Sequence, residues 1–381
     1  MLCKRLREND PKGLVSRNSG KASNCKINKH LIDRILELIY SKYTDFGPTL
    51  AHEKLSEVHN IAVSVSTVRN IMVAHEVWIP KKVKKKRIFQ HRQRRPSEGE
   101  LVQLDGSDHQ WFENRGSRCS LLVFIDDATG KAHLRFARSE NTWDYMKALR
   151  EYLEEQGRPI ALYTDKHGVF RVNHKNSQAK DALTQFGRAA KELGIQIICA
   201  NTPQAKGRVE RVNKTLQDRL VKELRLRKIS TIEEANSYLP TFIEDFNKHF
   251  SKPAKTPINA HKSIDGYDLD RIFTLKETRH LSKNLTLQYK NTIYQIKTSR
   301  SSYTLRKAHV TILEYESGKI EIEYKGEKLD FSAYHEQEHQ GKEVSSKLLN
   351  EEMDKLTKKK WKPARNHPWK RQRSKVLAEC V

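Results

Sequence analysis

Three short segments between residues 101 and 224 decide the fold: LVQLDGS (101–107), LYTDKHG (162–168) and PQAKGRVERVNKTLQ (203–217). Each contains one acidic residue, respectively Asp105, Asp165 and Glu210. The first two carboxylates follow short apolar runs and are expected at the ends of buried β-strands. Glu210 is expected on a helix that begins after Pro203.

An apolar stripe with helical spacing runs along this helix. It consists of Val209, Val212, Leu216 and Leu220. Because the stripe is expected to face a core, the polar residues between its members should point elsewhere. These are Glu210, Asn213, Lys214 and Gln217.

Two strand-end carboxylates and one helix carboxylate converge if the helix packs across the edge of the sheet. Such a cluster repels itself unless cations neutralise it, and hard divalent cations prefer oxygen ligands. Two ions about 3.5–4 Å apart, held by shared carboxylates, are the usual device for in-line displacement at phosphorus. The pattern therefore predicts a phosphoryl-transfer site formed by Asp105, Asp165 and Glu210.

In this order, the three segments resemble the acidic motifs of the integrase-core family, the RNase H-like (DDE) transposases and retroviral-type integrases. In particular, the chain resembles bacterial insertion-sequence transposases of the ISNCY group. That likeness includes FGPTLAHEKL (46–55) and NHPWKR (366–371) and covers nearly the whole chain. Asp165 and Glu210 are 45 residues apart, about ten more than in the commonest members, and the surplus fits the polar loop at 168–180.

The resemblance implies an α/β RNase H-like core at residues 99–252, with a mixed five-stranded sheet, flanking helices and a trailing helix. Besides the strands that carry the two aspartates, the chain offers the required elements in order. They are strands at 119–125, 132–137 and 195–200, and helices at 142–155 and 179–193. Asp126 and Asp127, in DDATG, are better explained by turn chemistry than by metal ligation.

The resemblance also implies the activity of a DNA transposase of an insertion sequence. Asp105 would bridge two Mg²⁺ ions, for which Mn²⁺ can substitute, with Asp165 on one ion and Glu210 on the other. The enzyme would cleave donor DNA and join the freed 3′-OH to target DNA. Its partners would be double-stranded transposon ends, target DNA and further copies of itself on DNA, in the bacterial cytoplasm. Two alternatives remain: an RNase H-fold nuclease, and a non-catalytic regulator derived from a truncated transposase.

Composition supports a nucleic-acid partner. The 381 residues include 72 Lys and Arg against 47 Asp and Glu, a net charge of +25, which favours polyanion binding over a merely soluble basic protein. No apolar run approaches the roughly 18 residues of a membrane span, so no membrane partner is expected. The five cysteines are scattered and predict neither a disulfide framework nor a zinc finger.

The N-terminal part predicts DNA contact. Residues 1–26 form a basic arm that resembles the exit from a further, upstream helix-turn-helix, so we expect the chain to begin late. Residues 27–80 predict a helix-turn-helix, with Asn28 capping its first helix and Ser64 or Ser66 its third. Its DNA-facing residues would be Thr67, Arg69 and Asn70. The alternative is a three-helix protein-interaction module.

A basic linker at 81–98 suits phosphate neutralisation, although a solvated spacer is the alternative. The candidate contacts in the linker are Lys84, Lys85, Lys86, Arg87, Arg92, Arg94 and Arg95. Around the acidic site, the candidate contacts are His167, Lys206, Arg208, Arg211 and Lys214. The alternatives there are a structural hydrogen bond for the histidine and a solvated salt-bridge face for the helix.

The C-terminal third begins with a helix at 231–250, which opens with a Thr231–Glu234 capping box and which Pro240 kinks or divides. Residues 270–335 predict a small β-barrel with turns at 289–291 and 317–318. Residues 336–381 predict a helix followed by a basic tail that carries two tryptophans.

Overall fold

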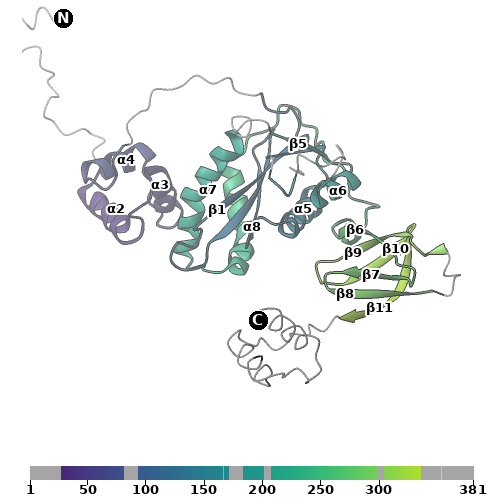
Figure 1. Ribbon diagram of the computed structural model, residues 1–381. Helices are drawn as coiled ribbons and strands as arrows, with labels where there is room; N and C mark the ends of the chain where they lie inside the picture. Colours follow the sequence, from purple (N-terminus) through teal and green to yellow (C-terminus); the bar gives the residue numbers. More distant parts are fainter. Residues whose placement is uncertain are drawn as a thin grey trace, which may run out of the picture. The chain divides into compact units, whose positions relative to one another are not determined.

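The structure is a computed structural model that describes residues 27–80, 93–165, 167–170, 183–200, 207–298, 304–335 and Met353. The chain divides into two units (Figure 1). The first comprises Met1–Leu275 with Glu314–Lys319, and the second comprises Lys276–Leu313 with Ile320–Val381.

A mixed five-stranded sheet forms the centre of the first unit, as the sequence predicted. Its strands are β1 (Leu101–His109), β2 (Cys119–Asp126), β3 (Ala132–Ala137), β4 (Ala161–Thr164) and β5 (Gln196–Cys199). The order across the sheet is β3-β2-β1-β4-β5. The first three strands form an antiparallel meander, whereas β4 and β5 run parallel to β1.

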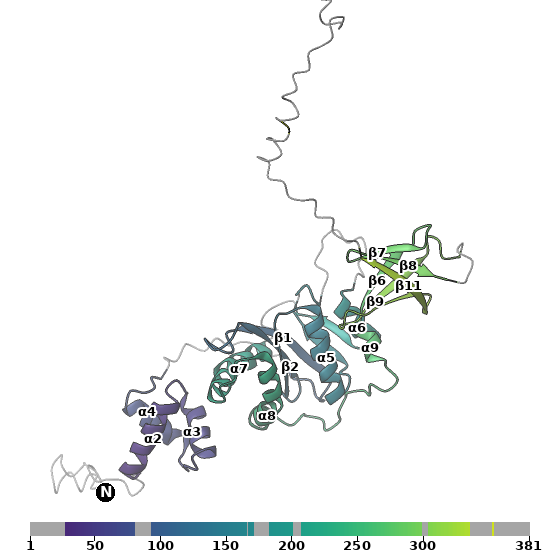
Figure 2. The ribbon, with the colours of Figure 1, turned by 90° about the horizontal axis from the view of Figure 1, so that it is seen from below.

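Helices cover both faces of this sheet (Figures 1 and 2). On one face lie α5 (Thr142–Gln156) and α6 (Gln185–Glu192), and on the other lie α7 (Gly207–Leu226) and α8 (Ile232–Phe250). Alternation along the strands supplies the two cores, because successive side chains point to opposite faces. Leu104 and Phe124 are buried on the α5 side, and Leu121 and Val123 on the α7 side.

The long helix α8 protects the outer strand of the sheet. Its predicted capping box between Thr231 and Glu234 is confirmed, and the helix passes through Pro240 without being divided. Asn236 donates to the carbonyl of Phe136 and accepts from its amide (3.0 and 2.8 Å). Asn247 does the same to Ala132 (3.1 and 2.7 Å). These side chains occupy backbone groups of β3 that would otherwise offer an edge for pairing with another strand.

Three short helices precede the sheet: α2 (Lys29–Lys42), α3 (Pro48–Glu57) and α4 (Val65–Ala74). The predicted caps are present, since Asn28 accepts from the amide of His30 and Ser64 from that of Thr67. The second helix begins at Pro48, because proline is well suited to the first turn. The three helices share a buried core that includes Ile35, Ile39, Leu55 and Met72.

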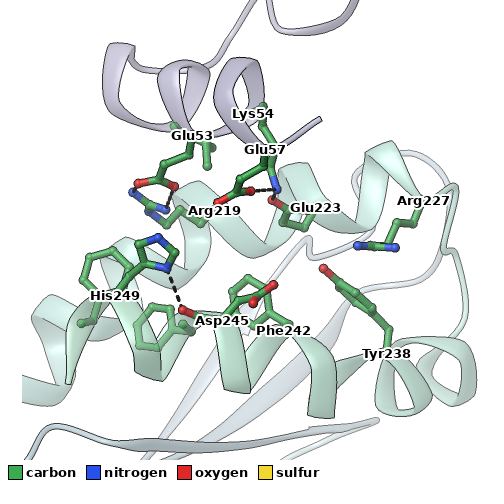
Figure 3. Close-up of a pocket in the computed structure, with 13 residues that line it drawn as sticks. Glu53, Lys54, Glu57, Arg219, Glu223, Arg227, Tyr238, Phe242, Asp245 and His249 are labelled. Atoms are coloured by element: carbon green, nitrogen blue, oxygen red, sulfur yellow. Dashed lines mark hydrogen bonds and ion pairs between the residues drawn. The ribbon is translucent and has the colours of Figure 1, made fainter. Parts of the chain in front are cut away.

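This three-helix group is ion-paired to the C-terminal half of α7 (Figure 3). Glu53 receives two hydrogen bonds from Arg219 (2.6 and 3.0 Å), and Lys54 pairs with Glu223 at 2.6 Å. Burial alone would lower the pKa of Lys54, but its hydrogen bond and attraction to Glu223 outweigh that effect and raise the pKa above its usual value. Arg219 also stacks over the ring of Phe250, 4.8 Å from its centroid.

We expect Glu53→Arg to weaken this contact strongly. The Glu53 and Arg219 side chains are only 17% and 15% exposed, so the substitution leaves two guanidinium groups facing each other with little solvent. Hydrogen bonds to charged groups contribute about 1.5–3 kcal/mol, and urea unfolding should report a loss of that order. The double variant Glu53→Arg with Arg219→Glu should recover part of the loss. Recovery should be incomplete because the new glutamate cannot stack on Phe250. Equal stability of wild type and Glu53→Arg would show that the pair contributes nothing.

The second unit contains a six-stranded, barrel-like sheet. Its strands are β6 (Leu275–His280), β7 (Thr286–Tyr289), β8 (Thr292–Lys297), β9 (His309–Glu314), β10 (Ile320–Tyr324) and β11 (Glu327–His335), in the order β6-β9-β10-β11-β8-β7. Both predicted turns are present, with positive φ at Lys290, Asn291 and Gly318. Strands β10 and β11 form a hairpin, whose turn at Lys325 and Gly326 has positive φ and was not among the predicted turns. In the described ranges, none of the helices has the length and apolarity needed to cross a bilayer.

Candidate active site

Asp105 lies in the middle of β1, not at its end as predicted. The strand continues to His109 because its antiparallel pairing with β2 extends from Val102 to His109. Parallel pairing with β4 covers only Leu101–Gln103. Asp105 therefore stands two residues beyond the last β4 pair, where β1 is no longer flanked on that side. This placement gives its half-buried carboxylate the accessibility that a strand end would have provided.

Helix α7 runs along β1 and contacts its alternate residues in order. Near its start, Arg208 is ion-paired with Asp127, which also accepts from Gln103 Nε2 at 2.7 Å. Further along, Asn213 Nδ2 donates to Asp105 Oδ2 at 2.9 Å, and Gln217 Nε2 to Ser107 Oγ at 3.1 Å. Gln103, Asp105 and Ser107 share one face of β1 because side chains alternate along a strand. One turn of α7 thus contacts Asp105, and the next turn contacts Ser107 beside it.

The prediction that Asn213 and Gln217 point away from the core was wrong, because both contact β1. Asn213 is the clearer case. It is 8% exposed and faces the sheet, because the spacing 209–213–216–220 places it on the same stripe as the apolar residues. Val209, Leu216 and Leu220 are buried as predicted. A polar residue at a core position of that stripe was the signal that could have identified Asn213.

The amide of Asn213 also provides a test of whether a metal fits here. Its Oδ1 is buried and has no hydrogen-bond partner within the described residues, although buried polar atoms are nearly always paired. Amide oxygens and carboxylates are the ligand types that hard divalent cations take. An oxygen of this kind beside Asp105 therefore suits a cation-binding site better than a purely structural hydrogen-bond network.

Asp165 directly follows β4 and shares the neighbourhood of Asp105. Its Oδ1 accepts from the backbone amide of His167 at 2.9 Å, and the side chain of His167 is exposed. Both aspartates act on the hydroxyl of the buried Tyr145. Burial raises the pKa of Tyr145 far above its ordinary value, and the charges of Glu140, Asp105 and Asp165 raise it further. Two of the three predicted carboxylates are therefore near enough to Tyr145 for their charges to act on its hydroxyl.

Glu210 is not brought into a ready-made metal centre with these aspartates. It is exposed in the first turn of α7, and among the residues described no three His, Cys, Asp or Glu side chains form a group able to hold a metal ion. Helical geometry explains the position: at 100° per residue, Glu210 lies about 60° around the axis from Asn213. The glutamate therefore flanks the line of contact with β1.

Asp126 and Asp127 have the structural roles predicted for them. Asp126 Oδ1 accepts from the amide and hydroxyl of Thr129 (2.7 and 2.8 Å), and its Oδ2 accepts from the amide of Gly99 at 2.8 Å. Asp127 is fully buried and accepts from the amide of Arg95 at 2.9 Å. Both carboxylates stabilise the turn between β2 and β3 and its neighbours.

The predicted DNA contacts have different surroundings. Arg211, Lys214 and Asn70 are exposed, whereas Arg208 pairs with Asp127 and Arg94 donates to the carbonyl of Ala128 at 2.9 Å. The hydroxyl of Thr67 lies 2.9 Å from that of Ser64, and Arg69 lies over the ring of Trp78. The remaining candidates, Lys84, Lys85, Lys86, Arg87, Arg92 and Lys206, lie outside the described residues.

Comparison with known proteins identifies the family. No protein-family model matches the chain. A protein of Sinorhizobium fredii named as transposase y4bF is 41% identical over 83% of this chain and 69% of its own length. The transposase for insertion sequence IS1202 of Streptococcus pneumoniae is 31% identical over 90% of this chain and 81% of its own length.

Two solved structures are also similar. The HTLV-2 integrase catalytic core domain in complex with magnesium is 17% identical over 37% of this chain and 82% of that chain, with a TM-score of 0.30. A simian T-cell lymphotropic virus intasome chain is 17% identical over 78% of this chain and 95% of that chain, with a TM-score of 0.35. These scores are too low to establish a common fold, so the assignment depends on the two transposases.

The molecule is therefore a transposase whose α/β core is built on a mixed five-stranded sheet. Identity above 30% along 90% of the chain establishes that it belongs to the transposases of bacterial insertion sequences.

Proposed function

We propose that this chain cleaves DNA at the ends of an insertion sequence and joins the freed 3′-OH to target DNA. Both steps are in-line displacements at phosphorus, so one site serves both. No protein nucleophile is required, because water and then the DNA hydroxyl attack. The substrates are double-stranded element ends and target duplex, bound by more than one copy of the chain.

One observation supports this proposal most directly: α7 places Asn213 on Asp105, one turn after Glu210. The helix that carries Glu210 is thereby fixed along β1, and Asp165 follows the end of β4, the strand that pairs with β1. A set of three acidic ligands requires the exposed Glu210 side chain to turn toward the two aspartates. Ordinary rotamer changes of an exposed glutamate provide this freedom.

Asp105, Asp165 and Glu210 would hold the Mg²⁺ ions, or Mn²⁺ in their place. When bound, the ions supply activation of the attacking oxygen and stabilisation of charge at phosphorus. The protein's own contribution is orientation. Asn213 fixes the Asp105 carboxylate through its amide, and the His167 backbone amide fixes that of Asp165.

The exposed bases on α7 are suited to guide the substrate. Arg211 and Lys214 flank Glu210 on the outer surface of the helix, where they would contact phosphates next to the scissile bond. His167 would contact DNA from the loop after β4. The three-helix group would read element ends through α4, with Thr67, Arg69 and Asn70 toward the major groove.

Cleavage of DNA ends distinguishes this function from that of an RNase H-fold nuclease. The purified chain, given Mg²⁺, should cut a duplex that carries the termini flanking its own gene and leave a 3′-OH. An RNA–DNA hybrid of the same sequence should stay intact. Cutting of the hybrid with the DNA duplex untouched would support the nuclease alternative, and binding without any cutting would support a regulator.

We also expect binding to non-specific duplex to weaken steeply as salt rises. Each neutralised phosphate contributes a slope of about −0.9 in log K against log salt. Replacing Lys84, Lys85, Lys86 and Arg87 with Gln removes four positive charges, and should flatten the slope by about three to four units. Fluorescence anisotropy of labelled duplex over a salt series measures this slope. The matched control replaces four exposed lysines of the second unit with Gln, namely Lys283, Lys290, Lys297 and Lys307. An unchanged slope would make the segment a spacer.

A further inference from the structure

The backbone of Gly106 lies directly against a side chain that the proposed reaction does not yet use. A Cβ at this position would collide with the carboxylate of Glu140, which precedes α5. Gly106 follows Asp105, so its missing side chain would point to the opposite face of β1 from the Asp105 carboxylate. Asn213 therefore contacts Asp105 on one face of β1, and Glu140 lies against the next residue on the other.

Glu140 is held in this position by a buried partner. The hydroxyl of Tyr145, a residue that is 1% exposed, donates to Glu140 Oε2 at 3.0 Å. The charges of Glu140, Asp105 and Asp165 all act on this hydroxyl. Glu140 is the carboxylate that contacts this hydroxyl, and it also lies against the residue that follows Asp105.

Capping of α5 does not explain Glu140. Asn141 caps that helix, with its side chain accepting from the amide of Asp144 at 2.8 Å. Tyr145 is the hydrogen-bond partner of Glu140, and no Lys or Arg pairs with it in the part of the chain that the structure describes. A half-buried carboxylate that lies against the residue following Asp105, without a cationic partner, is destabilising unless a cation compensates it.

We propose that Glu140 is a positioning residue of the metal centre: it fixes β1 behind Asp105 and adds a negative charge that strengthens cation binding. This inference assumes the proposed metal-dependent function. Glu140 does not replace Asp105, Asp165 or Glu210 as a ligand, since it stands behind the strand. Partners of this outer kind typically change metal affinity or activity 10–100-fold.

The test is thermal stabilisation of the full chain by Mg²⁺ at constant ionic strength, without DNA. In Glu140→Gln, the charge is lost while the amide oxygen still accepts from Tyr145. We expect the Mg²⁺ concentration at half-maximal stabilisation to rise about tenfold or more. The melting temperature of the metal-free chain should stay the same or rise, because repulsion from the two aspartates is relieved. Glu154→Gln, the same change on the exposed side of α5, is the matched control and should behave as wild type.

Two further variants separate the causes. Tyr145→Phe removes the hydrogen bond and keeps the charge, so it should shift the Mg²⁺ midpoint less than Glu140→Gln. Gly106→Ala forces the carboxylate away and should shift the midpoint in the same direction. Combined with Glu140→Gln, it should add little, because both act on one interaction.

The outcomes also separate this inference from the proposed function. Asp105→Asn should abolish stabilisation by Mg²⁺. A wild-type response of this variant would show that Asp105 holds no metal ion and would contradict the proposed function. If Asp105→Asn loses the response while Glu140→Gln keeps the wild-type midpoint, only the role of Glu140 is wrong. A lower metal-free melting temperature with an unchanged midpoint would make Glu140 a purely structural residue.

Discussion

Asp105→Asn, Asp165→Asn and Glu210→Gln are each expected to abolish Mg²⁺-dependent strand cleavage while DNA binding persists. Each substitution preserves shape and removes one negative ligand charge. A metal pair supplies several kcal/mol of charge stabilisation in the transition state, so losing a ligand should slow cleavage about 10³-fold or more. Cleavage of end-labelled duplex under single-turnover conditions measures this, alongside binding of the same duplex.

The matched controls are Asp108→Asn on the same strand and Asp218→Asn on the same helix, both exposed. They carry the same chemical change outside the site and should cleave at nearly the wild-type rate. Near-normal cleavage by any of the three site variants would remove that residue from the ligand set. Glu210→Gln is the most informative of them, because the structure leaves this side chain exposed and apart from the aspartates.

Asn213→Leu should separate activity from stability. The Asn213 amide donates to Asp105 at 2.9 Å, and its Oδ1 is buried without a hydrogen bond in the described residues. Leaving a buried polar atom unsatisfied costs about 1–3 kcal/mol, so a leucine of similar volume should not lower the melting temperature. Cleavage should nevertheless fall about 10–100-fold, because the orientation of the Asp105 carboxylate is lost.

Gln217→Leu provides the control one turn further along α7. Gln217 bonds Ser107 instead of an acidic residue, so cleavage should change much less. If Asn213→Leu cleaved normally and melted at a lower temperature, Asn213 would be a structural residue of the α7–β1 contact. The unpaired Asn213 Oδ1 would then be no support for a cation-binding site.

The strands and helices of the core could be predicted because their apolar periodicity is set by local burial. The strand at 132–137 and the helix beginning at Thr142 match the structure, and Asn28 and Thr231 cap as expected. The extension of β1 past Asp105 could not be predicted, because it depends on pairing with β2 across a loop. The hairpin at Lys325–Gly326 was missed because its flanking strands form one continuous alternating run.

The acidic residues of the site were identified from their order and neighbours, but their partners were not. Asn213 and Glu140 acquire their roles only when α7 and the segment before α5 meet β1 from opposite faces. Asn213 and Asp105 are 108 positions apart, and Glu140 and Gly106 are 34 apart (140 − 106), so no local pattern encodes these contacts. Ion pairing of Glu53 with Arg219 is another such contact, between segments separated by 166 residues.

Joining of DNA strands tests the central claim most directly. The purified chain would be incubated with Mg²⁺, a labelled duplex that carries the terminal sequence flanking its gene, and an unlabelled circular target. We expect the labelled 3′ end to become covalently attached to the target, with no product from Asp105→Asn. Wild-type chain that binds both DNAs and yields neither a cut nor a joined strand would contradict the assignment of this site as a DNA strand-transfer centre.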